Sequence, residues 1–135
     1  MQDLSVTIFQ QDLAWQDAPA NRAHFGRLLP AAAGSALALL PEMFATGFTM
    51  EPAGCAEAPD GPTVQWLRGQ AAQHGCAIAG SLAIGEAGAF RNRLLFARPD
   101  GMLQHYDKRH LFRMAGEHRS YVPGSERRVI GWAGW

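Results

Sequence analysis

Two charged residues, Glu42 and Lys108, stand where each could take part in acid–base chemistry. Glu42 follows the apolar run 36–41, and Lys108 follows the segment 102–106, which we interpret as a strand. Functional sites of open α/β sheets form just beyond strand ends. A carboxylate held there, partly removed from water, suits a general base, and an ammonium suits the stabilisation of an oxyanion. We therefore expect Glu42 and Lys108 to lie close together at the rim of one sheet.

Position alone also leaves an ordinary interpretation open for each of these residues. Glu42 could be a loop glutamate that follows a strand without any chemical role. Lys108 could belong to a solvated cluster with its neighbours Asp107 and Arg109, because charged side chains are mostly exposed to water.

The other reactive side chains give weaker signals. Glu117 lies in a polar stretch, 108–124, which we expect to be a loop, and alone it indicates no chemistry. The five histidines show no metal-ligand spacing of the kind His-Glu-x-x-His. Cys55 lies in an acidic loop rich in proline and glycine, and Cys76 begins an apolar segment, so neither is predicted to be a nucleophile.

The elements that must position these residues alternate between strands and helices. We expect helix 18–29 to be capped by Asp17, and a second helix to open at 61–63 and to end at Gly75. The order predicts an α/β fold with a mixed sheet. The expected strands are 4–10, 36–40, 76–84, 91–98, 102–106 and 127–132, with a loop over 42–61 and turns at 85–89 and 99–101.

Composition limits the functions that this chain could have. Its 135 residues fit one domain, and twelve basic residues balance twelve acidic ones, for a formal net charge of zero. This balance disfavours binding to nucleic acid or to an anionic membrane surface. We see no signal peptide, and two cysteines make no disulfide framework, so we expect a cytoplasmic protein.

Two segments resemble catalytic motifs of one known superfamily. The segment 39–48, Leu-Leu-Pro-Glu-Met-Phe-Ala-Thr-Gly-Phe, resembles the first catalytic motif of the nitrilase, or carbon–nitrogen hydrolase, superfamily. The segment 106–112, Tyr-Asp-Lys-Arg-His-Leu-Phe, resembles the second. The resemblance runs from about residue 4 to the last residue, and the wording of both motifs is most similar to the ω-amidase branch.

The resemblance implies a fold, a site and a reaction. Glu42 and Lys108 correspond to the glutamate and lysine of a Glu–Lys–Cys triad, and Glu117 to a supporting glutamate that positions the lysine. The triad would hydrolyse the terminal amide of a small molecule, a 2-oxo dicarboxylate monoamide, through a thioester, with no metal or organic cofactor. The implied fold is an α–β–β–α sandwich that forms homodimers. Residues 1–135 would be the N-terminal half of this single domain, and the nucleophilic cysteine, in a Cys-Tyr-Asp-Leu-Arg-Phe-Pro type of motif, would lie beyond residue 135.

Two alternatives stay open at this point. The chain could be a non-catalytic half-domain that pairs with another chain as an interaction module. It could also come from a nitrilase or a carbamoylase of the same superfamily, because the residues that shape the substrate pocket would lie largely in the other half.

Overall fold

The computed structural model describes residues 3–135; residues 1 and 2 of the expected domain 1–135 lie outside the described part. Its strands form one mixed sheet in the order β1-β2-β3-β4-β5. The first three strands run parallel, and the last two are antiparallel to their neighbours, which confirms the predicted α/β class. The strands are β1 (Val6–Ile8), β2 (Leu37–Leu39), β3 (Ala77–Glu86), β4 (Ala89–Ala97) and β5 (Leu103–Asp107).

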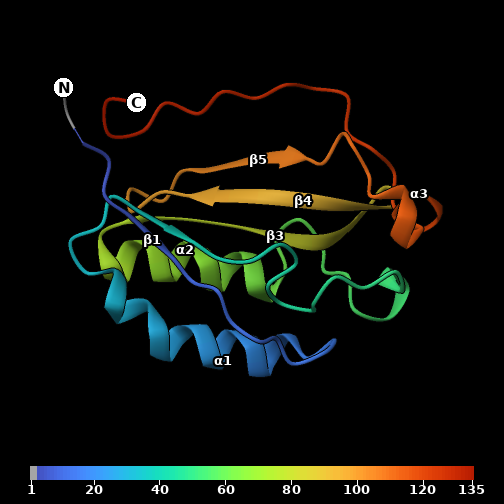
Figure 1. Cartoon of the computed structure of the whole chain (residues 1–135), viewed down its shortest axis with the longest axis horizontal. Coiled ribbons are helices and arrows are strands. Elements are labelled where there is room, and N and C mark those ends of the chain that lie inside the picture. Colours follow the sequence, from blue (N-terminus) through green and yellow to red (C-terminus); the bar gives the residue numbers. More distant parts are fainter. Residues whose placement is uncertain (1–2) are drawn as a thin grey trace.

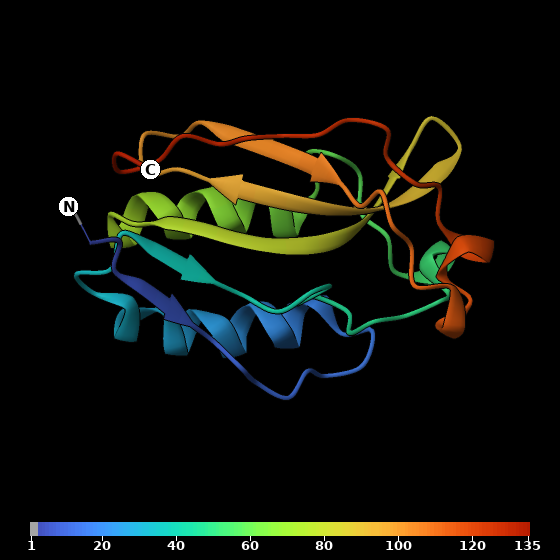
Figure 2. The same cartoon turned by 45° about the horizontal axis from the view of Figure 1, so that its top comes forward.

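Helices α1 (Ala18–Leu28) and α2 (Pro62–His74) both lie against one face of the sheet, as Figures 1 and 2 show. The predicted ends of these helices are confirmed. Oδ1 of Asp17 accepts the N–H of Ala20 at 3.0 Å, and Gly75 ends α2 in a left-handed conformation with φ of 64°. The remaining helical pieces are short: η1 (Leu29–Ala32), η2 (Pro52–Gly54), η3 (Arg113–Ala115) and α3 (Glu117–Ser120).

The main core lies between the two long helices and the sheet. Side chains of a strand point alternately to its two faces, and Ile78, Leu82 and Ile84 of β3 belong to the same buried cluster as Phe25 of α1 and Leu67 of α2. All five side chains are at most 2% exposed. This apolar layer packs the two helices against the sheet.

The opposite face of the sheet carries a smaller apolar cluster and the C-terminal segment, by which we mean residues 124–132. Ile130 and Trp132 of this segment pack against Ala77, Ala79 and Phe96. The indole N–H of Trp132 donates to the carbonyl of Ala36 at 2.7 Å. In Figures 1 and 2 the segment, drawn in red, passes over the side of the sheet opposite the helices.

The predicted strand 127–132 is therefore wrong. These residues form no strand, and in the described chain no backbone hydrogen bond joins 125–131 to the sheet. The reason is that Ile130 and Trp132, which are partly buried, pack against the face of the sheet, so the backbone crosses that face instead of pairing with β5. Val129, which directly precedes Ile130, is 95% exposed and does not pack against the sheet.

The described residues thus supply one helical layer and one sheet layer of the predicted α–β–β–α sandwich. Within residues 3–135, no helix combines the length and the hydropathy that crossing a bilayer would require.

Candidate functional site

Glu42 lies where the chain leaves the end of β2 and turns sharply. The next residue, Met43, has a positive φ of 49°, which is uncommon for a residue with a side chain. This turn is held by Ser81 of β3, whose Oγ accepts the N–H of Met43 at 2.8 Å and whose carbonyl accepts the N–H of Phe44 at 3.2 Å. The Glu42 side chain is 49% exposed, so its carboxylate is partly but not fully removed from water.

Lys108 follows directly after β5, and strand β4 on one side and the C-terminal segment on the other hold its backbone. Its N–H donates to the carbonyl of Asn92 at 2.9 Å, and its carbonyl accepts the N–H of Gly124 at 3.0 Å. The ammonium Nζ lies 2.8 Å from Oε1 of Glu42. The prediction that these two side chains lie close together at one sheet rim is therefore confirmed.

The alternative of a solvated cluster around Lys108 is wrong. Asp107 and Lys108 are consecutive, so their side chains leave the backbone in opposite directions. Asp107 accepts two hydrogen bonds from the guanidinium of Arg93, at 2.6 and 3.0 Å. Burial would raise the pKa of Asp107, but these bonds outweigh it and lower that pKa. Asp107 thus pairs with Arg93, while Lys108 contacts Glu42 and Glu117.

Glu117, expected in a loop, is the first residue of the short helix α3 and is fully buried, at 0% exposed. Its carboxylate accepts three hydrogen bonds: from Nζ of Lys108 at 2.8 Å, from Nδ2 of Asn92 at 3.0 Å and from the N–H of Phe112 at 2.6 Å. Burial by itself would raise the pKa of Glu117, but the hydrogen bonds from these donors lower it. Glu117 is therefore a buried, ionised carboxylate that accepts a hydrogen bond from Lys108 and holds its ammonium in place.

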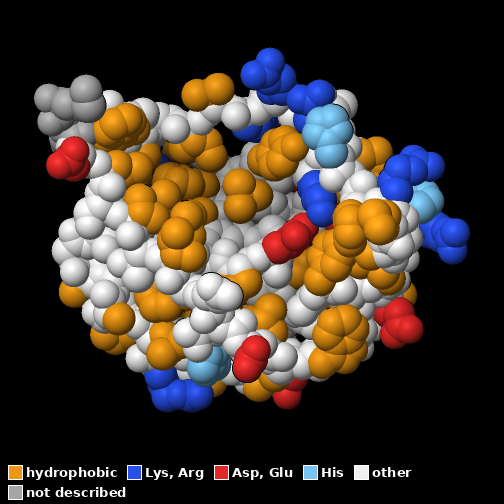
Figure 3. Space-filling model, viewed as in Figure 1, with side chains coloured by type: hydrophobic (Ala, Val, Ile, Leu, Met, Phe, Trp, Pro, Cys, Tyr) orange, Lys and Arg blue, Asp and Glu red, His pale blue; other side chains and the backbone are white. Residues whose placement is uncertain are grey.

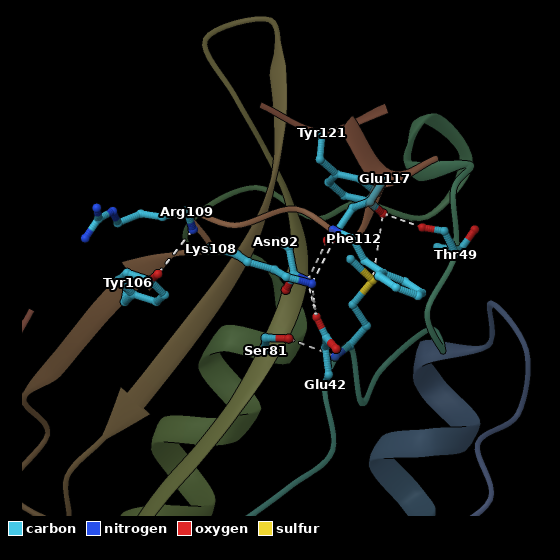
Figure 4. Close-up of polar contacts among 11 residues, drawn as sticks. Glu42, Thr49, Ser81, Asn92, Tyr106, Lys108, Arg109, Phe112, Glu117 and Tyr121 are labelled. Carbon is cyan, nitrogen blue, oxygen red and sulfur yellow. Dashed lines mark hydrogen bonds and ion pairs between the residues drawn. The ribbon is translucent and has the colours of Figure 1, made fainter. Parts of the chain in front are cut away.

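Helix α3 is fastened to the loop that follows Glu42. The hydroxyl of Tyr121 donates to the carbonyl of Thr49 at 2.9 Å, and that of Ser120 donates to the carbonyl of Met50 at 2.6 Å. Tyr121 is 2% exposed, and burial raises its pKa, so it stays a neutral donor. These bonds join the segment after the first motif to the segment after the second, and Figure 4 shows the contact between Tyr121 and Thr49.

The charge on Lys108 is maintained by its two carboxylate partners. Partial burial would lower the pKa of Lys108, but the hydrogen bonds that its ammonium donates to Glu117 and Glu42 raise it. The ammonium also lies 5.1 Å from the ring centroid of Phe48, a favourable position for a cation. An ammonium has three N–H donors, so the two carboxylates leave one for an oxygen of a bound molecule.

Asn92 of β4 is a site residue that the sequence analysis did not single out. Its Nδ2 lies 2.7 Å from Oε1 of Glu42 and 3.0 Å from Oε1 of Glu117 (Figure 4). Asn92 is 2% exposed. The sequence did contain a signal for this role: Asn92 is a polar residue on the same face of the strand as the apolar residues Leu94 and Phe96.

A hollow of about 270 Å³ opens beside these groups, on the sheet face that the helices leave uncovered. Figure 3 shows that this face is hollowed near its centre and that apolar side chains gather around the depression. The hollow thus joins a charged end to an apolar wall, which suits a small molecule with one polar reacting group. Its lining residues are Leu40, Glu42, Gly80, Ser81, Asn92, Leu94, Tyr106 and Lys108.

Neither cysteine of the chain is placed as a nucleophile. Cys76 is 1% exposed and directly precedes β3, at the strand end opposite the one where the parallel strand β2 leads to Glu42. The thiol of Cys55 donates to the carbonyl of Glu51 at 3.6 Å. Burial raises the pKa of both thiols, and Glu51 raises that of Cys55 further, which opposes formation of a thiolate. Among residues 3–135, no group of three His, Cys, Asp or Glu side chains is arranged to hold a metal ion.

Known proteins share this arrangement of strands and motifs. The sequence profile of the family described as Carbon-nitrogen hydrolase matches residues 5–132. The protein named Omega-amidase YafV from Yersinia enterocolitica is 45% identical over 135 residues, which are 100% of this chain and 52% of that protein. A 2-oxoglutaramate amidase from Bacillus subtilis is 34% identical over 91 residues, 65% of this chain and 35% of that protein.

A crystal structure from Xanthomonas campestris has nearly the same fold. It is described as a CN-hydrolase superfamily protein with an arsenic adduct in the active site, and it is 48% identical, with a TM-score of 0.96. The match covers 100% of this chain and 51% of that one. The chain therefore spans about half the length of these full-length relatives.

Proposed function

The chain belongs to the carbon–nitrogen hydrolase family, and on that premise we propose that it carries Glu42, Lys108 and the supporting Glu117 of a Glu–Lys–Cys amidase site. The observation that carries this proposal is the position of one lysine ammonium, 2.8 Å from each of two carboxylates, just beyond the ends of two strands. In this proposal the exposed carboxylate of Glu42 is the base, and the buried carboxylate of Glu117 positions the ammonium of Lys108.

In this proposal residues 1–135 form the N-terminal half of a single hydrolase domain, and the nucleophilic cysteine comes from the other half. The extent of the matches, about half of each full-length relative, supports this division. The raised pKa values of Cys55 and Cys76 also support a nucleophile outside these residues.

The proposed reaction has two stages. Glu42 takes the proton of the cysteine thiol, and the thiolate attacks the carbonyl carbon of the amide. The remaining N–H of the Lys108 ammonium, with a backbone N–H, stabilises the oxyanion. The C–N bond then breaks, the nitrogen takes the proton held by Glu42 and leaves as ammonia, and a thioester remains. Glu42 next accepts a proton from water, whose oxygen attacks the thioester; the C–S bond breaks, the sulfur takes that proton from Glu42, and the carboxylic acid and the thiol are released.

We propose a 2-oxo dicarboxylate monoamide, such as 2-oxoglutaramate, as the substrate. Relatives named omega-amidase and 2-oxoglutaramate amidase support this choice, and the small hollow next to Lys108 suits a molecule of this size. No metal or organic cofactor takes part in this mechanism. We also propose that the protein acts in the cytoplasm, where its two thiols, both free in the structure, would stay reduced. We propose a homodimer as well, as the family resemblance implies, and light scattering of the full-length protein tests it.

The test of the substrate is a comparison of kcat/KM for ammonia release by the full-length protein. We expect 2-oxoglutaramate to be the best substrate, ahead of an aliphatic nitrile and an N-carbamoyl amino acid. A preference for the nitrile or for the carbamoyl compound would favour the two neighbouring activities instead. Full-length protein without activity on any of the three would favour a non-catalytic interaction module.

A further inference from the structure

One amide group contacts both carboxylates of the site. The Nδ2 atom of Asn92 donates to Oε1 of Glu42 at 2.7 Å and to Oε1 of Glu117 at 3.0 Å (Figure 4). A side-chain amide nitrogen carries two hydrogens, so these two bonds use both of them. The carbonyl of the same residue accepts the N–H of Lys108 at 2.9 Å. Asn92 therefore contacts all three residues of this chain that we place in the site: Glu42, Lys108 and Glu117.

Charge fixes the orientation of this amide. Turned by half a rotation, the amide would aim its oxygen, which only accepts, at two carboxylate oxygens that also only accept. Asn92 is 2% exposed, so water would not relieve that repulsion. The strand register places its backbone opposite Ala83 of β3 and ties the amide to the sheet.

The same contacts distinguish the two oxygens of Glu42. Oε1 accepts hydrogen bonds from Asn92 and, at 2.8 Å, from Lys108. Oε2 accepts none from residues 3–135. Hydrogen bonds to a charged oxygen stabilise its ionised form, so the oxygen with two donors is the poorer proton acceptor.

Building on the proposed function, we propose that Asn92 is a positioning residue that holds Glu42 and Glu117 on either side of Lys108 and leaves Oε2 of Glu42 as the oxygen that accepts the proton. Asn92 acts through the carboxylates. Its effect falls on the rate of the chemical step, because misplacing a reacting group by about 1 Å can cost roughly a hundredfold in rate.

The test compares Asn92→Ala with Asn92→Asp in the full-length enzyme. Alanine removes both donors, so we expect kcat for ammonia release to fall about a hundredfold while KM changes little. Aspartate matches asparagine in size, but when ionised it only accepts hydrogen bonds and repels both glutamates. If the donors matter, aspartate is worse than alanine at neutral pH; if Asn92 only fills space, aspartate is better.

Asn21 provides a matched control. It is also a buried asparagine, 1% exposed, and its Nδ2 donates to the carbonyls of Ala14 and Ala45 at 2.7 and 2.8 Å. We expect Asn21→Ala to lower the melting temperature without the hundredfold loss in kcat.

A crystal structure of Asn92→Ala makes the test independent of the reaction. We expect the Glu42 carboxylate to leave its 2.8 Å contact with Lys108. Unmoved carboxylates, an alanine variant with kcat near wild type, or an aspartate variant better than the alanine variant would each overturn the role of Asn92. If wild-type enzyme releases no ammonia from any amide, the proposed function fails, whereas the crystal structure still decides whether Asn92 positions the carboxylates.

Discussion

The buried carboxylate of Glu117 lies 2.8 Å from the ammonium of Lys108, nine positions earlier in the chain. Nothing in the order of residues 108–117 places these two groups in contact. The contact arises because the chain turns through η3 and brings Glu117, the first residue of α3, back to the end of β5. It fixes both the charge and the direction of the lysine that faces Glu42.

Replacing Glu117 by glutamine should change how the stability of the full-length enzyme depends on pH. The pKa of Glu117 is lowered in the folded state, so its contribution is complete above the ordinary glutamate value of about 4.3 and is lost as pH falls through the folded-state pKa. At pH 7 we expect Glu117→Gln to lower the free energy of unfolding by about 3 kcal/mol, because it leaves Lys108 with one carboxylate fewer. Urea unfolding at pH 7 and at about pH 3.5 measures both effects.

Wild type and Glu117→Gln should therefore converge in stability as the pH falls. Glu126→Gln is the matched control, since the Glu126 side chain is 68% exposed and pairs with Arg128 at the surface; its stability should follow wild type at every pH. An equal difference between Glu117→Gln and wild type at both pH values would contradict the assignment of Glu117 as an ionised buried group.

Gly124 should tolerate no side chain, because its backbone packs against the end of β5. Its N–H donates to the carbonyl of Lys108 at 3.0 Å, and an added Cβ would lie 2.8 Å from the Cβ of Asp107 and would overlap the Asp107 carbonyl. We expect Gly124→Ala to destabilise the enzyme by about 2 kcal/mol and to lower activity by displacing Lys108. Thermal melting and ammonia release measure the two effects.

Gly69 of α2 is the control for that substitution. No atom lies within 4 Å of the position that its Cβ would take, and alanine in a helix interior is favoured over glycine by about 1 kcal/mol. Gly69→Ala should keep full activity and gain stability. If Gly124→Ala behaved in the same way, the close packing of Gly124 against Asp107 would not hold Lys108 in place.

Residues 1–135 produced alone should neither hydrolyse amides nor behave as a stable monomer. They contain no cysteine in a position to act as the nucleophile. The sheet face opposite the helices is covered only in part by the C-terminal segment, and Ile8 of the edge strand β1 is 72% exposed. Exposed apolar surface and open strand edges favour aggregation. A sharp monomer peak on size exclusion together with a cooperative melt would contradict the expectation of an incomplete fold.

The sequence predicted the parts of this fold that depend on local pattern. Caps such as Asp17 and Gly75 set the helix ends, and local patterns also predicted the strands that precede Glu42 and Lys108. Because parallel strand ends gather at one edge of a sheet, the contact between these two residues could be predicted before any coordinates.

Other features depend on contacts between distant segments, and these could not be predicted. Residues 127–132 can extend either as a paired strand or across a sheet face, and the structure gives the second. The role of Asn92 depends on its contacts with Glu42 and Glu117, which are 50 and 25 residues away from it in the sequence. The strand register and the packing of α3 beside the end of β5 determine those contacts, and the local sequence pattern predicts neither.

The central claim is that Glu42 is the base of an amidase, and one measurement tests it most directly. Ammonia release from 2-oxoglutaramate is measured for full-length wild type, Glu42→Gln and the surface control Glu126→Gln. Glutamine keeps the size of Glu42 but accepts no proton, so we expect kcat/KM to fall by about a thousandfold or more, while Glu126→Gln equals wild type. A Glu42→Gln enzyme that is folded and retains activity within about tenfold of wild type would contradict the account.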